Sequence, residues 1–464
     1  MLMSDPFQTH HMKLIILLFI SAIFSVSCLI SEPEIISPAE NGLVYGNACK
    51  LIVKSFSRPD FQIILDGEGC TASWFKEAWP FRWMTEISIL GKGEHELVLK
   101  RGDRETARIT FSNELSIQEI AEKVINQYFF DNRPENLKWD WAPAVFLYGL
   151  MKYAPFSSDE GRCIDFVSAY HTSWLEKGLP EINWADECPP ALSAMMLNDL
   201  YGIEFAMPAV IKAASYIRTA PRNKLGSIDH LGSSAFSLVY PDSIWADSLM
   251  MWALPAVQYG VDANDSDLLE FGIAQPFIFA DKLLDNKTGL FHHAWNIEAG
   301  TLCPRDNALW LRGNAWVMVS VIEMISILDV NHPRYQELCS MFRNLANSAL
   351  PYRQPSGFWD TVMAEPGYAY EESSGSALIA YAYAKGFRLG LLDETCMEAA
   401  RDTFSSITAR LKKGAAGYAV TGVSSGTIPS NRLGYKLVPT GDNILYGAGA
   451  YLMLATEMII SENQ

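Results

Sequence analysis

From Ser116 to the C-terminus, the apolar residues of this chain recur at the spacing of α-helices. Ser116 and Glu119 form a capping box, and the apolar residues that follow keep the helical i, i+3, i+4, i+7 spacing. This region holds about twelve such segments and hardly any strand pattern. The predicted helices lie near 117–129, 141–154, 159–177, 189–201, 205–219, 243–259, 265–284, 308–328, 333–349, 374–390, 393–412 and 443–460.

The number of predicted helices limits the architectures that such a chain can adopt. About twelve helices could form a solenoid, a bundle or a closed double ring, but no motif recurs at the fixed short period of a TPR or HEAT array. The count fits best an (α/α)6 barrel, in which the ends and loops of an inner ring of apolar helices line a central cleft. We therefore expect a mainly α fold, with residues 116–464 forming an (α/α)6 barrel.

The segment before the helices has a different texture. Residues 33–112 contain short runs of β-branched and aromatic residues between Gly, Pro and Asp, and the run from His95 to Lys100 alternates apolar and polar residues. Alternation with turns at a spacing near ten residues is typical of antiparallel sheets. The sequence thus predicts a small β-sandwich domain over residues 33–112.

The extreme N-terminus predicts export. An apolar run of 11 residues, Leu14 to Phe24, is too short to span a membrane but has the size of a signal-peptide core. The small residues before Cys28 resemble a bacterial lipoprotein signal, in which this cysteine would be acylated; ordinary cleavage and secretion is the alternative. Residues 1–28 are thus predicted to be a signal peptide, and the protein a periplasmic or outer-membrane-anchored lipoprotein whose only membrane contact is its N-terminal lipid.

Charge and missing motifs exclude several function classes. The formal net charge of −17 would repel phosphate, so nucleic acid is not an expected partner. The sequence contains no GxSxG, HExxH, P-loop or strand-linked GxGxxG motif. Cysteines and histidines do not occur at zinc-site spacing either, so we expect no metal and no cofactor.

Two aspartates stand at predicted loop-to-helix junctions. Asp242 is the expected N-cap of its helix, which places Asp247 about one turn inside, among apolar neighbours. Asp247 is then either an acid that favours the helix dipole or a desolvated carboxylic acid of raised pKa, suited to general acid catalysis. Asp186 precedes a helix that begins with proline, where it is either an N-cap or part of a site.

Aromatic and basic residues stand at similar junctions. Arg312 and Trp316 are spaced i, i+4 on one helical face, with Trp310 just before them. Such a unit can hold a planar carboxylate and stack a sugar ring, or the arginine can stack on tryptophan for structure alone. His293 lies in an aromatic-flanked turn, where a structural role is equally open, and Trp141 is either a cavity wall or core.

In this order, these stretches resemble a known enzyme family. WDWAPAVFLYGL, IWADSLMM, TGLFHHAW and WLRGNAWV resemble segments of the unsaturated rhamnogalacturonyl hydrolases of glycoside hydrolase family 105 and the related unsaturated glucuronyl hydrolases of family 88. The resemblance implies that Asp247 is the catalytic acid/base and Asp186 a second active-site carboxylate. It implies substrate-binding roles for the remaining members of the set: Trp141, His230, His293, Trp310, Arg312 and Trp316.

The reaction implied by this resemblance starts at a double bond. Such enzymes remove a 4,5-unsaturated uronic acid from the non-reducing end of acidic oligosaccharides produced by lyases, without a metal or cofactor. Asp247 would protonate C4, water would add at C5, and the resulting hemiketal would expel the glycosidic bond. Two alternatives remain open. One is a conventional inverting glycosidase that uses Asp186 and Asp247 on a saturated uronide; the other is a surface lipoprotein that binds glycans without catalysis.

Overall fold

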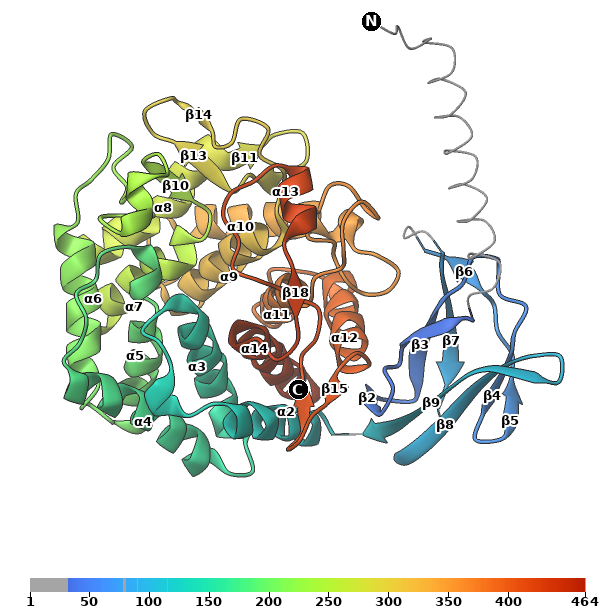
Figure 1. The fold of residues 1–464 in the computed structure, drawn as a ribbon. Coiled ribbons are helices and arrows are strands. Elements are labelled where there is room, and N and C mark those ends of the chain that lie inside the picture. Colours follow the sequence, from blue (N-terminus) through green and yellow to red (C-terminus); the bar gives the residue numbers. More distant parts are fainter. Residues whose placement is uncertain (1–31, 78–80, 90, 115, 464) are drawn as a thin grey trace, which may run out of the picture.

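The computed structural model describes residues 32–77, 81–89, 91–114 and 116–463. The chain consists of a β-rich N-terminal region and a larger helical region that lie side by side (Figure 1). The predicted signal peptide and Cys28 lie outside the described residues. Within the described ranges, no helix has both the length and the apolar character needed to cross a membrane.

In the described part of the N-terminal region, the strands form two sheets. The strand orders are β1-β3-β7-β6 and β2-β9-β8-β4-β5, and all pairs are antiparallel except the parallel pair β2 and β9. One core cluster takes apolar side chains from both sheets, including Leu51 and Val53 of one and Leu97 and Leu99 of the other. The strands are β1 (Glu34–Ser37), β2 (Gly42–Tyr45), β3 (Ala48–Lys54), β4 (Gln62–Leu65), β5 (Glu68–Cys70), β6 (Phe75–Lys76), β7 (Arg82–Ser88), β8 (Gly93–Arg101) and β9 (Arg104–Glu114).

The helical region begins where the sequence predicts it, because Ser116 caps the first long helix by accepting a hydrogen bond from the backbone N–H of Glu119. Each predicted helix has a counterpart whose boundaries lie within a few residues of the prediction, except the one predicted over residues 243–259. The long helices are α2 (Ile117–Asp131), α3 (Trp141–Tyr153), α4 (Glu160–Lys177), α5 (Pro190–Tyr201), α6 (Met207–Thr219), α7 (Leu254–Asp262), α8 (Ser266–Leu283), α9 (Leu311–Ile327), α10 (Tyr335–Ala349), α11 (Ser373–Arg388), α12 (Glu394–Thr408) and α14 (Leu445–Glu462).

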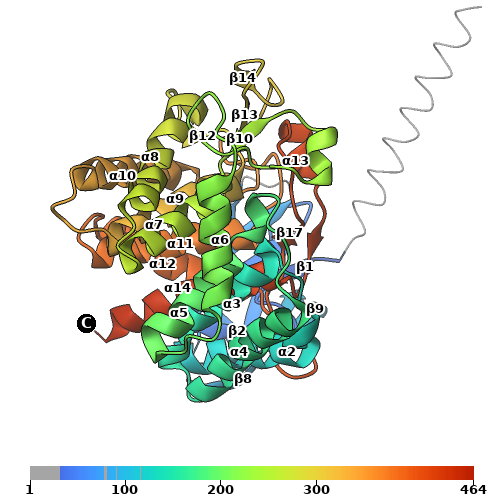
Figure 2. The same ribbon diagram turned by 90° about the vertical axis from the view of Figure 1, so that its left-hand side faces the viewer.

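Within the described residues, these helices pack as two concentric rings. The inner ring runs α3, α5, α7, α9, α11, α14 and back to α3, each helix contacting the next. The outer helices α2, α4, α6, α8, α10 and α12 each pack against inner ones, and Figures 1 and 2 show the ring and its side view. The fold is the α/α barrel that the sequence predicts.

The burial of each helix matches its place in the rings. Almost every residue of the inner helix α9 is buried, whereas the outer helix α10 buries only one face. The ring closes between α3 and α14 at Gly149 and Gly449. A Cβ on Gly149 would lie 2.2 Å from the carbonyl oxygen of Gly449, so this close backbone contact requires a residue without a side chain.

The structure differs from the sequence prediction over residues 243–259. The segment begins as strand β10 (Ser243–Trp245), turns at Asp247, and continues through a π-helical turn, Leu249–Ala253, into α7. β10 pairs with β13 (Ala294–Asn296), and β13 pairs with β14 (Thr301–Leu302). This small sheet, which the sequence analysis did not predict, lies on the same side of the helical region as the short helix α13 (Arg432–Leu437) (Figure 1).

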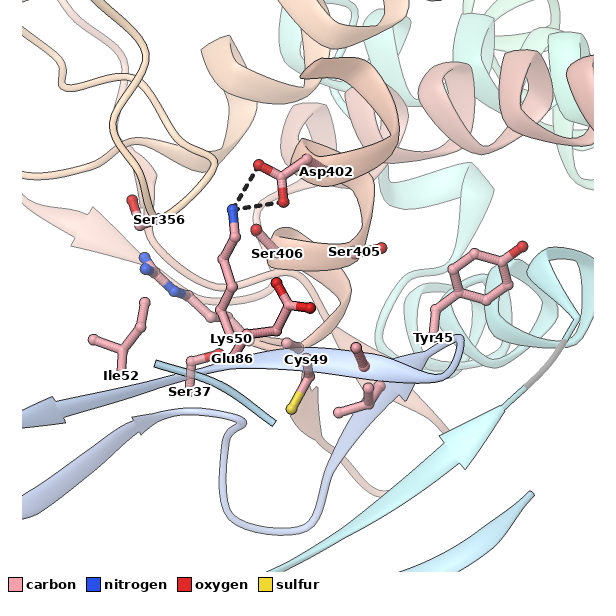
Figure 3. Close-up of a pocket in the computed structure, with 14 residues that line it drawn as sticks. Ser37, Tyr45, Cys49, Lys50, Ile52, Glu86, Ser356, Asp402, Ser405 and Ser406 are labelled. Carbon is pink, nitrogen blue, oxygen red and sulfur yellow. Dashed lines mark hydrogen bonds and ion pairs between the residues drawn. The ribbon is translucent and has the colours of Figure 1, made fainter. Parts of the chain in front are cut away.

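The β-rich region contacts the outer helix α12 and the segment after it. Tyr45 packs edge-on against Phe404, with ring centroids 5.6 Å apart, and the backbone N–H of Ala39 donates to the carbonyl of Ala409. Lys50 of β3 forms an ion pair of 2.5 Å with Asp402 of α12, at a small cavity between the two regions (Figure 3). The two regions are thus joined by apolar, backbone and ionic contacts.

Candidate active site

A cavity of about 350 Å³ brings most of the candidate residues together. It lies among the N-terminal ends of inner helices and the loops before them, which is where an α/α barrel was expected to place its cleft. The candidates that line it are Trp141, Asp186, His230, Asp247, Trp310 and Arg312; His293 and Trp316 are buried next to it.

Asp247 does not lie inside a helix, as the sequence analysis expected, but in the turn between β10 and the π-helical turn. Its carbonyl oxygen accepts the first helical hydrogen bonds, from the N–H groups of Met250 and Met251. The carboxylate faces the cavity, and Oδ2 lies 2.8 Å from Nε2 of His293. Asp247 therefore has a cationic or hydrogen-bonding partner at close range.

This partner reverses the expected pKa shift of Asp247. Burial acts to raise the pKa of the carboxyl, but the charge and hydrogen bond of His293, together with His230 and Arg312, outweigh it, and the pKa lies below its usual value. The alternative of a raised pKa for Asp247 was therefore wrong. The segment around Asp247 gave no indication of His293, which reaches it only through the fold.

His293 lies behind Asp247 rather than in the cavity wall. Its imidazole is fully buried, stacks on Trp310 with centroids 4.2 Å apart, and places Nδ1 2.9 Å from the hydroxyl of Tyr435. Direct substrate contact, which the family resemblance implied for His293, is therefore not available in this structure. The histidine instead holds Asp247 in place, with Tyr435 fixing the ring from the opposite side.

Asp186 lies across the cavity in a short 3-10 helix, Ala185–Glu187, and is not the N-cap of α5. Its Oδ1 lies 3.4 Å from Nε2 of His230. Burial raises its pKa well above the usual value, and the charges of Asp140 and Asp247 add to this effect. The two cavity carboxyls thus differ, because Asp186 retains its proton to higher pH than Asp247.

His230 is a neutral member of the site. Burial lowers its pKa to about 4, although the charge of Asp247 opposes this shift. Its Nδ1 lies 2.9 Å from the hydroxyl of Ser248, and its ring stacks on Trp245 with centroids 4.3 Å apart. Both ring nitrogens are thus within reach of polar partners, so His230 can orient Asp186 without carrying charge at neutral pH.

Arg312 has more partners within the chain than the sequence suggested. Its NH1 donates to Ser424 at both the carbonyl and the hydroxyl, and its NH2 donates to the carbonyl of Ser425 at 3.0 Å and to the hydroxyl of Thr427 at 3.2 Å. Arg312 thus has a structural role, although the partners that it holds are loop residues in addition to tryptophan. The guanidinium lines the cavity and at the same time holds the loop of residues 424–427 beside it.

The aromatic residues divide into wall and core. Arg312 lies 4.7 Å from the ring of Trp310, and Trp141, the first residue of α3, packs 4.5 Å from Tyr446; both tryptophans line the cavity. Trp316 is buried and contacts Trp141 edge-on, with centroids 6.3 Å apart. The predicted sugar contact of Trp316 is thus replaced by a supporting role behind the wall.

The sequence analysis missed an apolar rim on the cavity. Phe236, Val239 and Tyr240 from one loop and Ile428 from another line the mouth, together with Trp184. The hydroxyl of Tyr240 lies 3.4 Å from the carbonyl of Pro429 and links the two loops. In the sequence, this rim was indicated only by apolar residues within loops rich in Gly, Ser and Pro.

The described residues give no indication of a metal site, since no group of three or more His, Cys, Asp or Glu side chains within them could hold an ion. The titratable and charged groups that line the cavity are two carboxyls, the imidazole of His230 and the guanidinium of Arg312. Two carboxyls of opposite pKa shift, each paired with an imidazole, form an arrangement suited to acid/base chemistry.

Comparisons with known proteins find relatives of this chain. Residues 116–461 match the family described as Glycosyl Hydrolase Family 88. The unsaturated rhamnogalacturonyl hydrolase YesR of Bacillus subtilis (strain 168) is 25% identical over 355 residues, which cover 76% of this chain and 97% of that protein. The unsaturated 3S-rhamnoglycuronyl hydrolase of Alteromonas sp. (strain LOR) is 26% identical over 336 residues, 71% of this chain and 79% of that protein.

The fold has counterparts among solved structures. A family 105 glycoside hydrolase from C. acetobutylicum ATCC 824 superposes with a TM-score of 0.65 at 22% identity, covering 74% of this chain and all of that chain. The matched part of this chain in the family comparison is the helical region, and the β-rich segment lies before it. The resemblance that the sequence motifs indicated is thereby confirmed.

Proposed function

We propose a function for this chain on the premise that it belongs to glycosyl hydrolase family 88, which matches residues 116–461. The chain is therefore a glycoside hydrolase, and the alternative of a protein that only binds glycans is set aside. The proposed reaction is removal of a 4,5-unsaturated uronic acid from the non-reducing end of an acidic oligosaccharide. The observation that carries this proposal is the Asp247 carboxyl, which faces one cavity together with the guanidinium of Arg312 and the indoles of Trp141 and Trp310.

The substrate in this reaction is a vinyl ether, because its C4=C5 double bond is attached to the ring oxygen. Protonation at C4 gives oxocarbenium character at C5, and water attacks there. Asp247 is the proposed acid at C4 and then takes the proton of the attacking water. The hemiketal formed at C5 opens and releases the next sugar, so the bond at C1 is never attacked directly.

The low pKa of Asp247 in the empty site requires a source for the proton that it delivers. In the free protein the carboxyl must therefore take up a proton before it can act as an acid. A substrate carboxylate that enters the cavity raises the pKa of Asp247 by like-charge repulsion and by displacing water. Both effects favour the protonated form of Asp247 at the moment when the double bond is in place.

Recognition of the substrate would come from the opposite wall. Arg312 supplies the positive charge in the cavity lining. Trp141 and Trp310 supply flat apolar surfaces for the sugar ring. We propose that the substrate carboxylate lies on the Arg312 side and the double bond over Asp247.

A second candidate reaction is favoured by one observation. In a conventional inverting glycosidase, one carboxylic acid protonates the leaving group while a carboxylate activates water. The raised pKa of Asp186 and the lowered pKa of Asp247 would fit these two roles, acid and base respectively. Such an enzyme would cleave a saturated uronide and attack C1.

Isotope labelling separates the two reactions. In D₂O, the proposed mechanism places one deuterium on C4 of the uronic product, and in H₂¹⁸O the new oxygen enters at C5. The absorbance of the C4=C5 chromophore disappears as product forms. Cleavage of the saturated uronide with ¹⁸O at C1 would refute the proposal and support the inverting mechanism.

Domain boundaries and cellular location are part of the same proposal. We propose that residues 116–464 form the catalytic domain and that residues 33–112 form a separate β-sandwich, since its two sheets contribute to one core cluster. We further propose export through a signal peptide of residues 1–28, with acylation at Cys28 as the membrane anchor. Metabolic labelling with a fatty-acid analogue tests this, because Cys28→Ala should abolish the incorporation of label.

A further inference from the structure

We propose that the β-rich N-terminal region orders the wall of the active-site cavity through Arg82, a positioning residue outside the matched family region. The proposal rests on the function proposed above only in that the cavity is taken as the substrate site. Its physical basis is a continuous series of buried polar contacts. The series leads from Arg82 of β7, through the start of α11, to the loop that Arg312 holds.

The first contact crosses between the two regions. The NH1 group of Arg82 donates to Oε2 of Glu371 at 2.9 Å, while its Nε lies 2.8 Å from Oε2 of Glu77. Both carboxylates are buried, and Glu371 also pairs with Arg410 at 2.6 Å. Burial acts to raise the pKa of Glu371, but Arg410 and Arg82 lower it to about 2, so this carboxylate stays charged. Arg82 is thus one of two arginines paired with Glu371, the residue before the N-cap of α11.

The second contact links α11 to the cavity loop. Glu372 follows Glu371 directly and is the N-cap of α11, accepting from the N–H groups of Ser374 at 3.1 Å and Gly375 at 2.7 Å. The same carboxylate accepts from the N–H of Ser424 at 3.0 Å. Because one fully buried side chain serves both partners, the position of residues 371–372 sets the position of the loop.

The third contact reaches the cavity itself. Ser424 accepts hydrogen bonds from Arg312, and the next residues of the loop, Gly426, Thr427 and Ile428, line the cavity. Arg312 lies 3.9 Å from Glu372 and so belongs to the same cluster. A shift of Glu371 would therefore be transmitted to the guanidinium that we place against the substrate carboxylate.

The chain offers a matched control. Lys50 and Asp402 form another partly buried ion pair between the two regions (Figure 3). Asp402 also pairs with Arg353. Asp402 lies on the outer helix α12, and its contacts run to Lys50 and Arg353 instead of to residues 422–428. Loss of this pair weakens the attachment of the β-rich region and removes no member of the series that starts at Arg82. Ser356 and Arg410, the other partners of Glu371, line the same small cavity as Lys50 and Asp402 and stay in place in Lys50→Met.

The test compares Arg82→Gln with Lys50→Met in the full-length protein. Because Glu77 is buried beside Arg82, Arg82→Gln is also made together with Glu77→Gln, so that no carboxylate is left without its cation. Amide hydrogen exchange of residues 422–428 is measured without substrate. Steady-state kinetics is measured on a lyase-generated unsaturated disaccharide.

We expect faster exchange over residues 422–428 in both Arg82 variants and normal exchange in Lys50→Met. We also expect KM to rise about 2- to 30-fold in the Arg82 variants, the range of couplings transmitted through such networks, with a smaller change in kcat. Arg82→Lys should change the exchange and KM less than Arg82→Gln does, because lysine keeps a positive charge beside Glu371.

Two outcomes would overturn the inference. One is unchanged exchange over residues 422–428 in the Arg82 variants; the other is an equal change in Lys50→Met, which would mean that any loosening of the β-rich region has this effect. An inactive wild-type enzyme would count against the proposed function instead. The exchange data would still decide the role of Arg82 in that case.

Discussion

The buried imidazole of His230 should make the folded protein sensitive to acid. Its pKa is about 4 in the folded chain, whereas an exposed histidine has a value near 6.5. As the pH falls from 7 to 4, this histidine therefore binds a proton in the unfolded chain but stays mostly neutral in the folded chain, and the free energy of unfolding decreases. At 1.36 kcal/mol per pH unit, the contribution of this one residue is about 3 kcal/mol.

The variant His230→Asn removes the titrating group while keeping a neutral polar side chain. Urea titrations at pH 7 and pH 4 give the free energy of unfolding of both proteins. The variant should be less stable at pH 7, since its contacts with Ser248 and Asp186 are altered. Its loss between pH 7 and pH 4 should nevertheless be about 3 kcal/mol smaller than that of the wild type. Equal losses in the two proteins would show that His230 is not held neutral by the fold.

Three further predictions concern the site and the barrel. Asp247→Asn should lower kcat by about 10² to 10⁴-fold in a protein that still folds, and activity within a few-fold of wild type would remove Asp247 from the mechanism. Arg312→Lys should raise KM for the natural substrate and also for one whose carboxyl group has been reduced, since the substitution also releases residues 424–427. An increase in KM confined to the natural substrate would mean that the loop does not depend on Arg312. Glu323→Gln should cost about 3 to 5 kcal/mol in urea unfolding, because it leaves Lys385, 2.7 Å away in the barrel interior, without its counter-ion; a cost below 1 kcal/mol would contradict this.

Local patterns in the sequence were sufficient to predict the barrel. The inner and outer helices are set by apolar periodicity and by caps such as Ser116, which are encoded within a few residues of each other. The β-rich segment was likewise predictable from alternation. The error at residues 243–259 has a local cause, because an apolar segment this short fits a strand, a π-helical turn and a helix equally well.

The chemistry of the site could be predicted only in part. Motif positions identified the residues around the cavity, but the charge state of Asp247 depends on His293, which strand pairing between β10 and β13 brings beside it. The partners of Arg312 come from residues 424–427, far along the chain. The charge state of a carboxyl and the hydrogen-bond partners of a guanidinium depend on tertiary contacts, so they cannot be predicted from the pattern of a single segment.

The contact between Gly149 and Gly449 has a consequence for how the protein is made. Gly449 lies on α14, and α3, its partner, is the second long helix of the barrel. During synthesis, the apolar faces of α3 and α11 stay uncovered until α14 has left the ribosome. The ring is therefore completed only once α14 has been made, through a contact of very large sequence separation. Closing so long a loop costs chain entropy before the contact can form, which slows folding.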